Sequence, residues 1–112
     1  MDLVQRLNQH HPKIIDLSLD RIIRLLDLLD NPQNSLPPVV HIAGTNGKGS
    51  TLAFARAIAE AAGLNVHVYT SPHLVKFNER IRISGEIIGD HELLELISEV
   101  EDRNGNYPIT FF

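Results

Sequence analysis

The feature that most constrains this chain is an apolar run followed by a glycine-rich turn and then by a helix-forming run. The apolar run covers residues 39–43, the turn at residues 44–49 holds three glycines and Lys48, and the helix-forming run starts at Ser50. A strand, a glycine-rich turn with a lysine, and a helix are typical of triphosphate-binding sites. The sequence therefore predicts a buried strand that ends in an anion-binding loop.

Each residue type in this turn suits a bound phosphate group. Glycines let the backbone bend tightly and point its N–H groups inward, and a helix N-terminus adds partial positive charge. Lys48 supplies a full charge for the β- and γ-phosphates, which makes it the predicted catalytic residue. The predicted ATP-binding residues are Gly44, Thr45, Asn46, Gly47, Lys48, Gly49 and Ser50. The alternative is an ordinary βα turn that is merely rich in glycine.

The spacing within the turn departs from the usual phosphate loop, in which Ser or Thr directly follows the lysine. Here Gly49 intervenes. Residues 44–51 resemble the loop of the Mur ligase superfamily, which makes amide bonds at the expense of ATP. They are most similar to its bifunctional dihydrofolate synthase/folylpolyglutamate synthase family. Three further segments resemble blocks of the same family in the same order, namely residues 15–21, 69–82 and 110–112.

This resemblance implies an ATP-dependent ligase that adds L-glutamate to dihydropteroate, to reduced folates, or to both, through an acyl phosphate. It implies ATP as co-substrate and Mg²⁺ as cofactor, with Ser71 as the metal ligand and Ser50 as a weaker candidate. Without the resemblance, Ser71 would merely begin a Ser-Pro turn. The implied dihydropteroate-binding residues are Ile15, Asp16, Leu17, Thr110, Phe111 and Phe112. Phe111 and Phe112 would stack on the pterin, or would alternatively belong only to the core.

Composition narrows the classes of partner and location. The formal net charge is −4, with 14 acidic and 10 basic residues, and no basic cluster that would favour nucleic acid. No apolar run approaches the roughly 18 residues of a membrane span, and no signal peptide is evident. With zero cysteines, disulfides and thiolate chemistry are excluded. We expect a cytoplasmic protein with small-molecule ligands and without an obligate protein partner.

The sequence predicts an α/β fold: part of a doubly wound, mostly parallel, phosphate-loop sheet, preceded by a short helical segment. Residues 1–38 would form the helical segment and linker, and residues 39–112 the first part of the ATP-binding domain. Predicted helices cover residues 2–10, 18–30, 50–62 and 90–103, with Ser18 as a cap and Gly63 as a stop. Predicted strands cover residues 39–43 and 66–69, with a small hairpin over residues 80–88.

Proteins of the resembling family are several times longer than this chain, which stops within an apolar run. Several family parts would follow later, including a metal-binding glutamate and histidine, a modified lysine and a glutamate-binding domain. We therefore expect the chain to be an N-terminal piece that is inactive by itself. The alternatives are a stand-alone nucleotide-binding module without ligase activity, and a remnant without an intact site.

The sequence leaves the roles of three basic side chains open and predicts that two further histidines pack. His73 would pair with a phosphate or carboxylate, or would be a surface residue. Arg80 and Arg82 would steer anionic substrates, or would form a solvated edge. His41 and His67 lie within predicted strands, and we expect them to pack.

Overall fold

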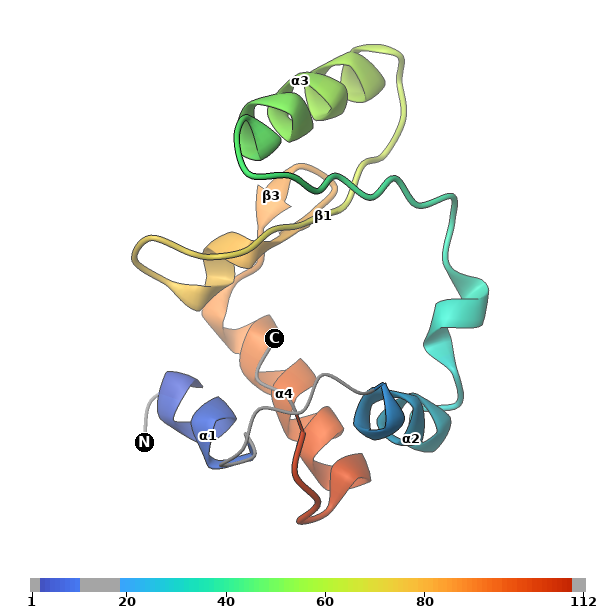
Figure 1. Ribbon diagram of the computed structural model, residues 1–112, viewed down its shortest axis with the longest axis vertical. Helices are drawn as coiled ribbons and strands as arrows, with labels where there is room; N and C mark the ends of the chain where they lie inside the picture. The colour runs from blue at the N-terminus through green and yellow to red at the C-terminus, as the bar shows by residue number, and fades with distance from the viewer. Residues whose placement is uncertain (1–2, 11–18, 110–112) are drawn as a thin grey trace. The chain divides into compact units, whose positions relative to one another are not determined.

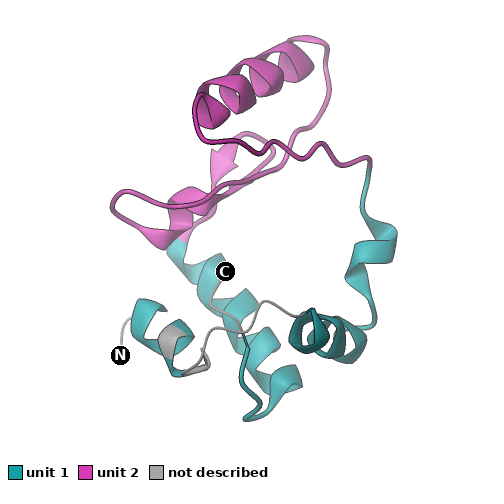
Figure 2. Cartoon of the chain, viewed as in Figure 1, with its two compact units in different colours: residues 1–37, 90–112 teal, residues 38–89 magenta. Residues whose placement is uncertain are grey.

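The structure is a computed structural model that describes residues 3–10 and 19–109. It is an α/β chain with a small antiparallel sheet, and it divides into two compact units (Figure 2). Unit 1 comprises residues 1–37 and 90–112, and unit 2 comprises residues 38–89. None of the helices in the described ranges is both long and apolar enough to cross a membrane.

The elements follow one another as drawn in Figure 1. They are the helices α1 (Leu3–His10) and α2 (Asp20–Leu28), the 3₁₀ turn η1 (Pro32–Ser35), helix α3 (Lys48–Ala61), strand β1 (Val68–Tyr69), the 3₁₀ turn η2 (Phe77–Arg80), strands β2 (Ile81–Ile83) and β3 (Glu86–Ile87), and helix α4 (Asp90–Asn104).

Unit 1 is built from α1, α2 and α4, which confirms the helices predicted for these segments. Leu25 of α2 and Leu93 of α4 are its buried apolar side chains among the described residues. The predicted cap Ser18 lies outside the described residues. The residue that precedes α2 is Leu19, which makes no side-chain capping hydrogen bond.

A polar cluster ties α2 to the end of α4. Asn104 is only 2% exposed, accepts a hydrogen bond from Arg24 and donates one from Nδ2 to the Tyr107 carbonyl at 2.8 Å. The Arg24 guanidinium also lies 4.3 Å from the centroid of the Tyr107 ring, a cation–π distance. On α1, Arg6 pairs with Glu101 of α4. Polar contacts therefore supplement a small apolar core in this unit.

The sheet of unit 2 has the order β1-β2-β3 with both pairs antiparallel. The turn between β2 and β3 consists of Ser84 and Gly85, whose φ angles are 50° and 87°. Positive φ at both central residues is the conformation that matches the twist of a two-residue hairpin, and glycine favours it. The hairpin predicted over residues 80–88 is thus confirmed.

The predicted strand over residues 39–43 is not formed in the structure. These residues have no regular secondary structure, and Val39 and Val40 are 71% and 79% exposed. No parallel pair joins any two strands of the described chain. The reason is physical: a parallel strand is stabilised by neighbouring strands and by layers on both faces, and residues 39–43 have neither here. The doubly wound sheet is therefore not present in these residues.

Helix α3 begins at Lys48, two residues earlier than predicted. It ends just before Gly63, the residue predicted to stop it. Gly63 has φ of 86° and donates its N–H to the Glu60 carbonyl at 2.9 Å. Leu64 donates to the Ala59 carbonyl at 3.1 Å. This pair of bonds is the Schellman motif, in which a left-handed residue satisfies the last helical carbonyls.

Replacing Gly63 with Ala should destabilise α3, because an L-residue in the left-handed region costs roughly 1–2 kcal/mol. We expect the free energy of unfolding, measured by urea titration of the helical circular dichroism, to fall by about 1 kcal/mol. Gly63→Asn is the matched control and should lose less, since asparagine tolerates this conformation. Equal losses for Ala and Asn would contradict the motif.

Candidate functional site

The glycine-rich turn lies between the irregular segment 39–43 and helix α3, with all seven predicted ATP-binding residues exposed. The backbone bends at residues 45–47, and the helix starts at Lys48. Gly44 and Gly47 have φ of 152° and 73°, values that side chains other than glycine rarely adopt. Two of the three glycines of the turn are therefore required by its geometry.

The N-terminus of α3 has the properties of an anion site. Its first backbone hydrogen bond runs from Thr51 N–H to the Gly47 carbonyl at 2.9 Å, so the N–H groups of the preceding residues have no helical acceptor. Gly47 makes no side-chain cap, and the first turn contains no acidic residue. The helix dipole and the Lys48 side chain then both contribute positive charge. These residues fit a phosphate group.

Ser71, the predicted metal ligand, lies two residues after β1 on an exposed loop. Within the described ranges, no group of three or more His, Asp or Glu side chains could hold a metal ion. Serine hydroxyls would fit Mg²⁺ as partial ligands, because this ion takes many of its oxygens from water and substrate phosphates.

The carboxylate of Glu79 holds the loop that follows Ser71. It accepts hydrogen bonds from the backbone N–H groups of Leu74, Val75 and Lys76 at 3.0, 3.0 and 2.6 Å. The bonds from Lys76 and Leu74 lower the pKa of this carboxyl below its ordinary value of 4.5. Glu79 is therefore an internal brace of the loop.

The residues on either side of Glu79 anchor the same loop to the sheet. Asn78 is buried and donates from Nδ2 to the Ile88 carbonyl at 3.0 Å. The Arg80 carbonyl accepts the Thr70 N–H at 2.8 Å, and its buried side chain contacts His73. The solvated-edge interpretation of Arg80 is thus wrong, and substrate steering by Arg80 stays a prediction. The only sequence signal for the bracing role of Glu79 is the position of this acid, three residues after the segment 74–76 that it holds.

Arg82, His41 and His67 also have defined places in the structure. Arg82 donates to the Gly85 carbonyl at 3.2 Å and so supports the hairpin turn. His41 and His67 are exposed and lie outside the strands, so the prediction that they pack is wrong. His67 instead accepts the Ser84 N–H on Nδ1 at 2.9 Å.

The dihydropteroate-binding prediction concerns residues that the structure does not describe. Ile15, Asp16, Leu17, Thr110, Phe111 and Phe112 all lie outside the described residues. The described parts of unit 1 that come nearest to them in sequence are α2 and the turn after α4. Their role stays a prediction.

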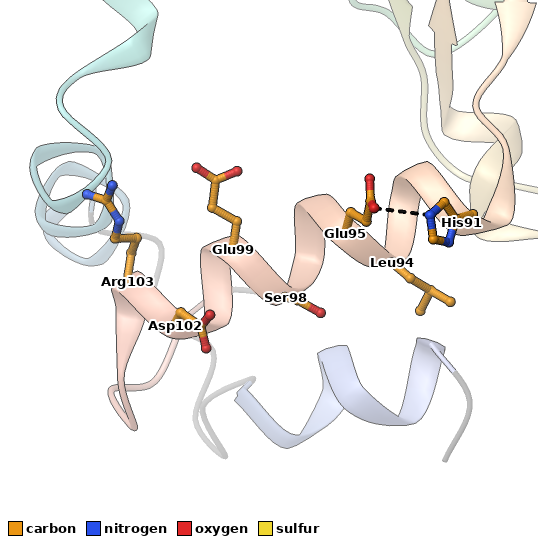
Figure 3. Close-up of a pocket in the computed structure, with 7 residues that line it drawn as sticks. All are labelled: His91, Leu94, Glu95, Ser98, Glu99, Asp102 and Arg103. Carbon is orange, nitrogen blue, oxygen red and sulfur yellow. Dashed lines mark ion pairs between the residues drawn. The ribbon is translucent and has the colours of Figure 1, made fainter.

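A cavity of about 500 Å³ lies along α4 (Figure 3). Its lining residues all come from that helix and are His91, Leu94, Glu95, Ser98, Glu99, Asp102 and Arg103. None of them is a predicted site residue. Three of the seven are acidic, and Glu95 already pairs with His91 at 3.0 Å. An acidic lining disfavours phosphate, so we place the candidate site at the loops of unit 2 and not in this cavity.

Comparison with known proteins agrees with the resemblance of the motifs. No protein-family model matches the chain. The dihydrofolate synthase/folylpolyglutamate synthase of Escherichia coli (strain K12) is 38% identical over 102 residues, which are 91% of this chain and 24% of that protein. The chain thus spans about a quarter of the length of this relative.

Solved structures give the same answer for the fold. The bifunctional folylpolyglutamate synthase/dihydrofolate synthase of Yersinia pestis, complexed with AMPPNP and Mn ion, matches 97% of this chain and 26% of its own. Its TM-score is 0.86 at 37% identity. A bifunctional synthase with Mn, AMPPNP and L-glutamate bound matches the same shares with a TM-score of 0.85 at 36% identity.

Sequence and fold therefore identify one class of proteins, the synthases named for folates and their polyglutamates. The chain belongs to the dihydrofolate synthase/folylpolyglutamate synthase family, and it covers about a quarter of the length of the members that it matches.

Changing Glu79 to Gln should loosen the loop, because a neutral amide cannot accept three N–H groups as a carboxylate does. We expect hydrogen exchange at the amides of residues 74–76 to accelerate several-fold, measured by nuclear magnetic resonance. Glu86→Gln, at an exposed side chain of the same unit, is the control and should leave those amides unchanged.

Acid should reproduce this effect in the unchanged protein. Because the pKa of Glu79 is lowered in the folded chain, its contribution is fully present above the ordinary value of 4.5 and is lost as the pH falls through the lowered value. Exchange rates corrected for intrinsic pH dependence should rise in that window in the wild type and not in Glu79→Gln. Corrected exchange rates that do not change with pH in this window would contradict the role assigned to Glu79.

Proposed function

We propose that this chain is the ATP- and pterin-binding front part of a ligase that adds L-glutamate to dihydropteroate, to reduced folates, or to both. The observation that carries the proposal is the uncapped N-terminus of α3 behind a glycine turn with Lys48. The named relatives support the substrate class, and the AMPPNP and Mn bound to one of them support ATP and a divalent metal.

The carboxylate of the folate substrate is a poor acylating agent, because its leaving group would be oxide. The proposed chemistry therefore begins by converting it to an acyl phosphate. A carboxylate oxygen of the folate substrate attacks the γ-phosphorus of ATP, the bond to the β-phosphate oxygen breaks, and ADP leaves. The resulting acyl phosphate is attacked by the amine of glutamate. The tetrahedral intermediate collapses to the amide, and inorganic phosphate leaves with the electron pair.

In this proposal the turn residues bind and orient the triphosphate. The free N–H groups at the start of α3 and the Lys48 ammonium would offset charge that develops on the transferring phosphoryl group. Ser71, with Ser50 as the weaker candidate, would contribute hydroxyl oxygens to Mg²⁺, which supplies further charge neutralisation when bound. No covalent enzyme intermediate is required.

The finer structural predictions belong to this proposal too. Residues 39–43 would become a strand when neighbouring strands and covering layers are present, giving the doubly wound, mostly parallel sheet of a phosphate-loop domain. Residues 1–38 would be the helical preface and residues 39–112 the first part of that domain. Ile15, Asp16, Leu17, Thr110, Phe111 and Phe112 would bind the pterin end, and the working location would be the cytoplasm.

Lys48→Ala should weaken binding of Mg·AMPPNP to residues 1–112 by at least about tenfold, since a hydrogen bond between charged groups contributes roughly 1.5–3 kcal/mol. Calorimetry at millimolar ligand measures the change. Arg56→Ala is the control, because it removes the same charge from the same helix two turns away and breaks only the pair with Glu60.

Unchanged affinity in Lys48→Ala would contradict the phosphate loop. Binding of GTP in preference to ATP, without any binding of dihydropteroate, would favour the stand-alone nucleotide-binding module instead.

Residues 1–112 alone should not incorporate glutamate into dihydropteroate, because the glutamate-binding and further metal-binding parts are expected elsewhere in the family. The measurement is incorporation of radiolabelled glutamate with ATP present. Turnover at an ordinary enzyme rate, about 1 s⁻¹ or faster, would overturn this part of the proposal.

A further inference from the structure

The chain contains two Asn-Gly pairs, and the structure places them in opposite environments. Asn46-Gly47 lies in the glycine-rich turn, and Asn104-Gly105 lies at the end of α4. In an Asn-Gly pair the backbone nitrogen of the glycine can attack the side-chain amide of the asparagine, because glycine has no side chain that hinders the approach. Asparagine is accordingly among the thermolabile residues of proteins. The two pairs thus offer a matched comparison within one chain.

At Asn104 the reacting groups are all engaged in other contacts. The side chain is only 2% exposed, its Oδ1 accepts a hydrogen bond from Arg24, and its Nδ2 donates to the Tyr107 carbonyl at 2.8 Å. The N–H of Gly105, whose nitrogen would be the nucleophile, donates to the Glu101 carbonyl at 3.1 Å. Attack at this pair therefore requires local opening of the end of α4.

At Asn46 the same groups are accessible. Asn46 and Gly47 are both exposed. Within the described part of the chain, neither the side-chain amide of Asn46 nor the N–H of Gly47 makes a hydrogen bond. Gly47 contributes only its carbonyl to helix α3, as the acceptor of the Thr51 N–H at 2.9 Å. The nucleophile and the amide that it attacks are therefore both available without any opening of the helix.

We propose that Asn46-Gly47 is a site of spontaneous deamidation, which makes the predicted phosphate loop acidic. The Gly47 nitrogen gives up its proton and bonds to Cγ of Asn46, and the bond from Cγ to Nδ2 breaks as ammonia leaves with that proton. The product is a cyclic imide. Water then opens the imide at either carbonyl, which yields aspartate or isoaspartate. The net reaction consumes water, releases ammonia and adds a negative charge to the loop.

The new charge falls where the proposed function needs positive potential. Asn46 directly precedes Gly47, the N-cap of α3, and lies two residues before Lys48. A carboxylate at this place is attracted by the same helix dipole that attracts a phosphate, and it repels the phosphate itself. Isoaspartate also lengthens the loop, because its backbone runs through the former side-chain carbon. Loss of nucleotide binding with age is the expected consequence. This consequence rests on the proposed function, whereas the modification does not.

The first test follows both asparagines while residues 1–112 are kept in warm, mildly alkaline buffer. Mass spectrometry of proteolytic fragments assigns the conversion of amide to acid at each position. Because Asn104 must first lose a hydrogen bond from a charged group, we expect Asn46 to convert at least about tenfold faster. Equal rates, or faster conversion at Asn104, would overturn the proposal.

Concentrated urea provides the matched control for the fold. In the unfolded chain both asparagines lack protecting contacts and both precede glycine, so their rates should agree within a few-fold. A difference as large in urea as in buffer would show that neighbouring residues set the rates, and the structural argument would fail. Asn46→Gln is the second control. Its longer side chain needs a larger ring, so residue 46 should stay unconverted while the rate at Asn104 is unchanged.

The nucleotide tests the link to the proposed function. Phosphate oxygens that accept the Gly47 N–H would occupy the nucleophile, so saturating Mg·AMPPNP should slow conversion at Asn46 several-fold and leave Asn104 unchanged. Rapid conversion that ignores Mg·AMPPNP would count against the phosphate loop and leave the modification site standing. Nucleotide binding by a chain whose Asn46 never converts would overturn the modification and leave the proposed function standing.

The charge itself is tested with Asn46→Asp against Asn46→Gln. Both variants remove asparagine, and only aspartate adds a negative charge beside the start of α3. Calorimetry with Mg·AMPPNP should therefore give weaker binding for Asn46→Asp than for Asn46→Gln. Equal affinities of the two variants would refute the loss of binding that we assign to deamidation.

Discussion

The candidate site depends most on one carboxylate, that of Glu79, which binds three successive backbone N–H groups of residues 74–76. An exposed loop between a two-residue strand and a 3₁₀ turn would otherwise have little to order it. With Asn78 fastened to Ile88 and Arg80 to Thr70 and His73, three consecutive residues anchor one loop at separate points. The loop that carries Ser71 is therefore ordered by its own residues, and such preorganisation would lower the entropic cost of binding at the proposed site.

Unit 2 also contains a segment whose backbone N–H groups are not satisfied by a carboxylate side chain, namely the start of α3. The N-terminus of α3 is left open, without a cap and without an acid in its first turn. Backbone N–H groups without acceptors at the start of a helix lower its stability, and a ligand that brings hydrogen-bond acceptors restores that stability. One loop is thus satisfied internally by a carboxylate, while at the other Gly47 makes no side-chain cap and the first turn of α3 contains no acidic residue. This contrast is why we propose residues 44–50 as the phosphate-binding segment, with the loop held by Glu79 contributing Ser71 as the proposed metal ligand.

The sequence predicted the elements whose signals are local. Gly63 stops α3, Ser84-Gly85 turns the hairpin, and the helix from Asp90 ends at Asn104, each from turn chemistry or from helical period. Residues 39–43 were predicted as a strand from their apolarity and their place before the glycine-rich turn, and a strand also needs lateral partners, which these residues do not have in the described sheet. Arg80 was misjudged because alternation of polar and apolar residues does not show that a basic side chain turns inward to a histidine seven residues earlier. The site residues themselves followed from motifs, and their roles remain predictions.

The most direct measurement of the central claim uses paramagnetic broadening by Mn²⁺ with AMPPNP in residues 1–112, which detects even weak binding. If the two loops of unit 2 form one phosphate and metal site, amides near Ser50 and Ser71 will broaden together at the same ligand concentration. Broadening confined to the acidic face of α4, around Glu95, Glu99 and Asp102, would show metal held by surface carboxylates and would contradict the account.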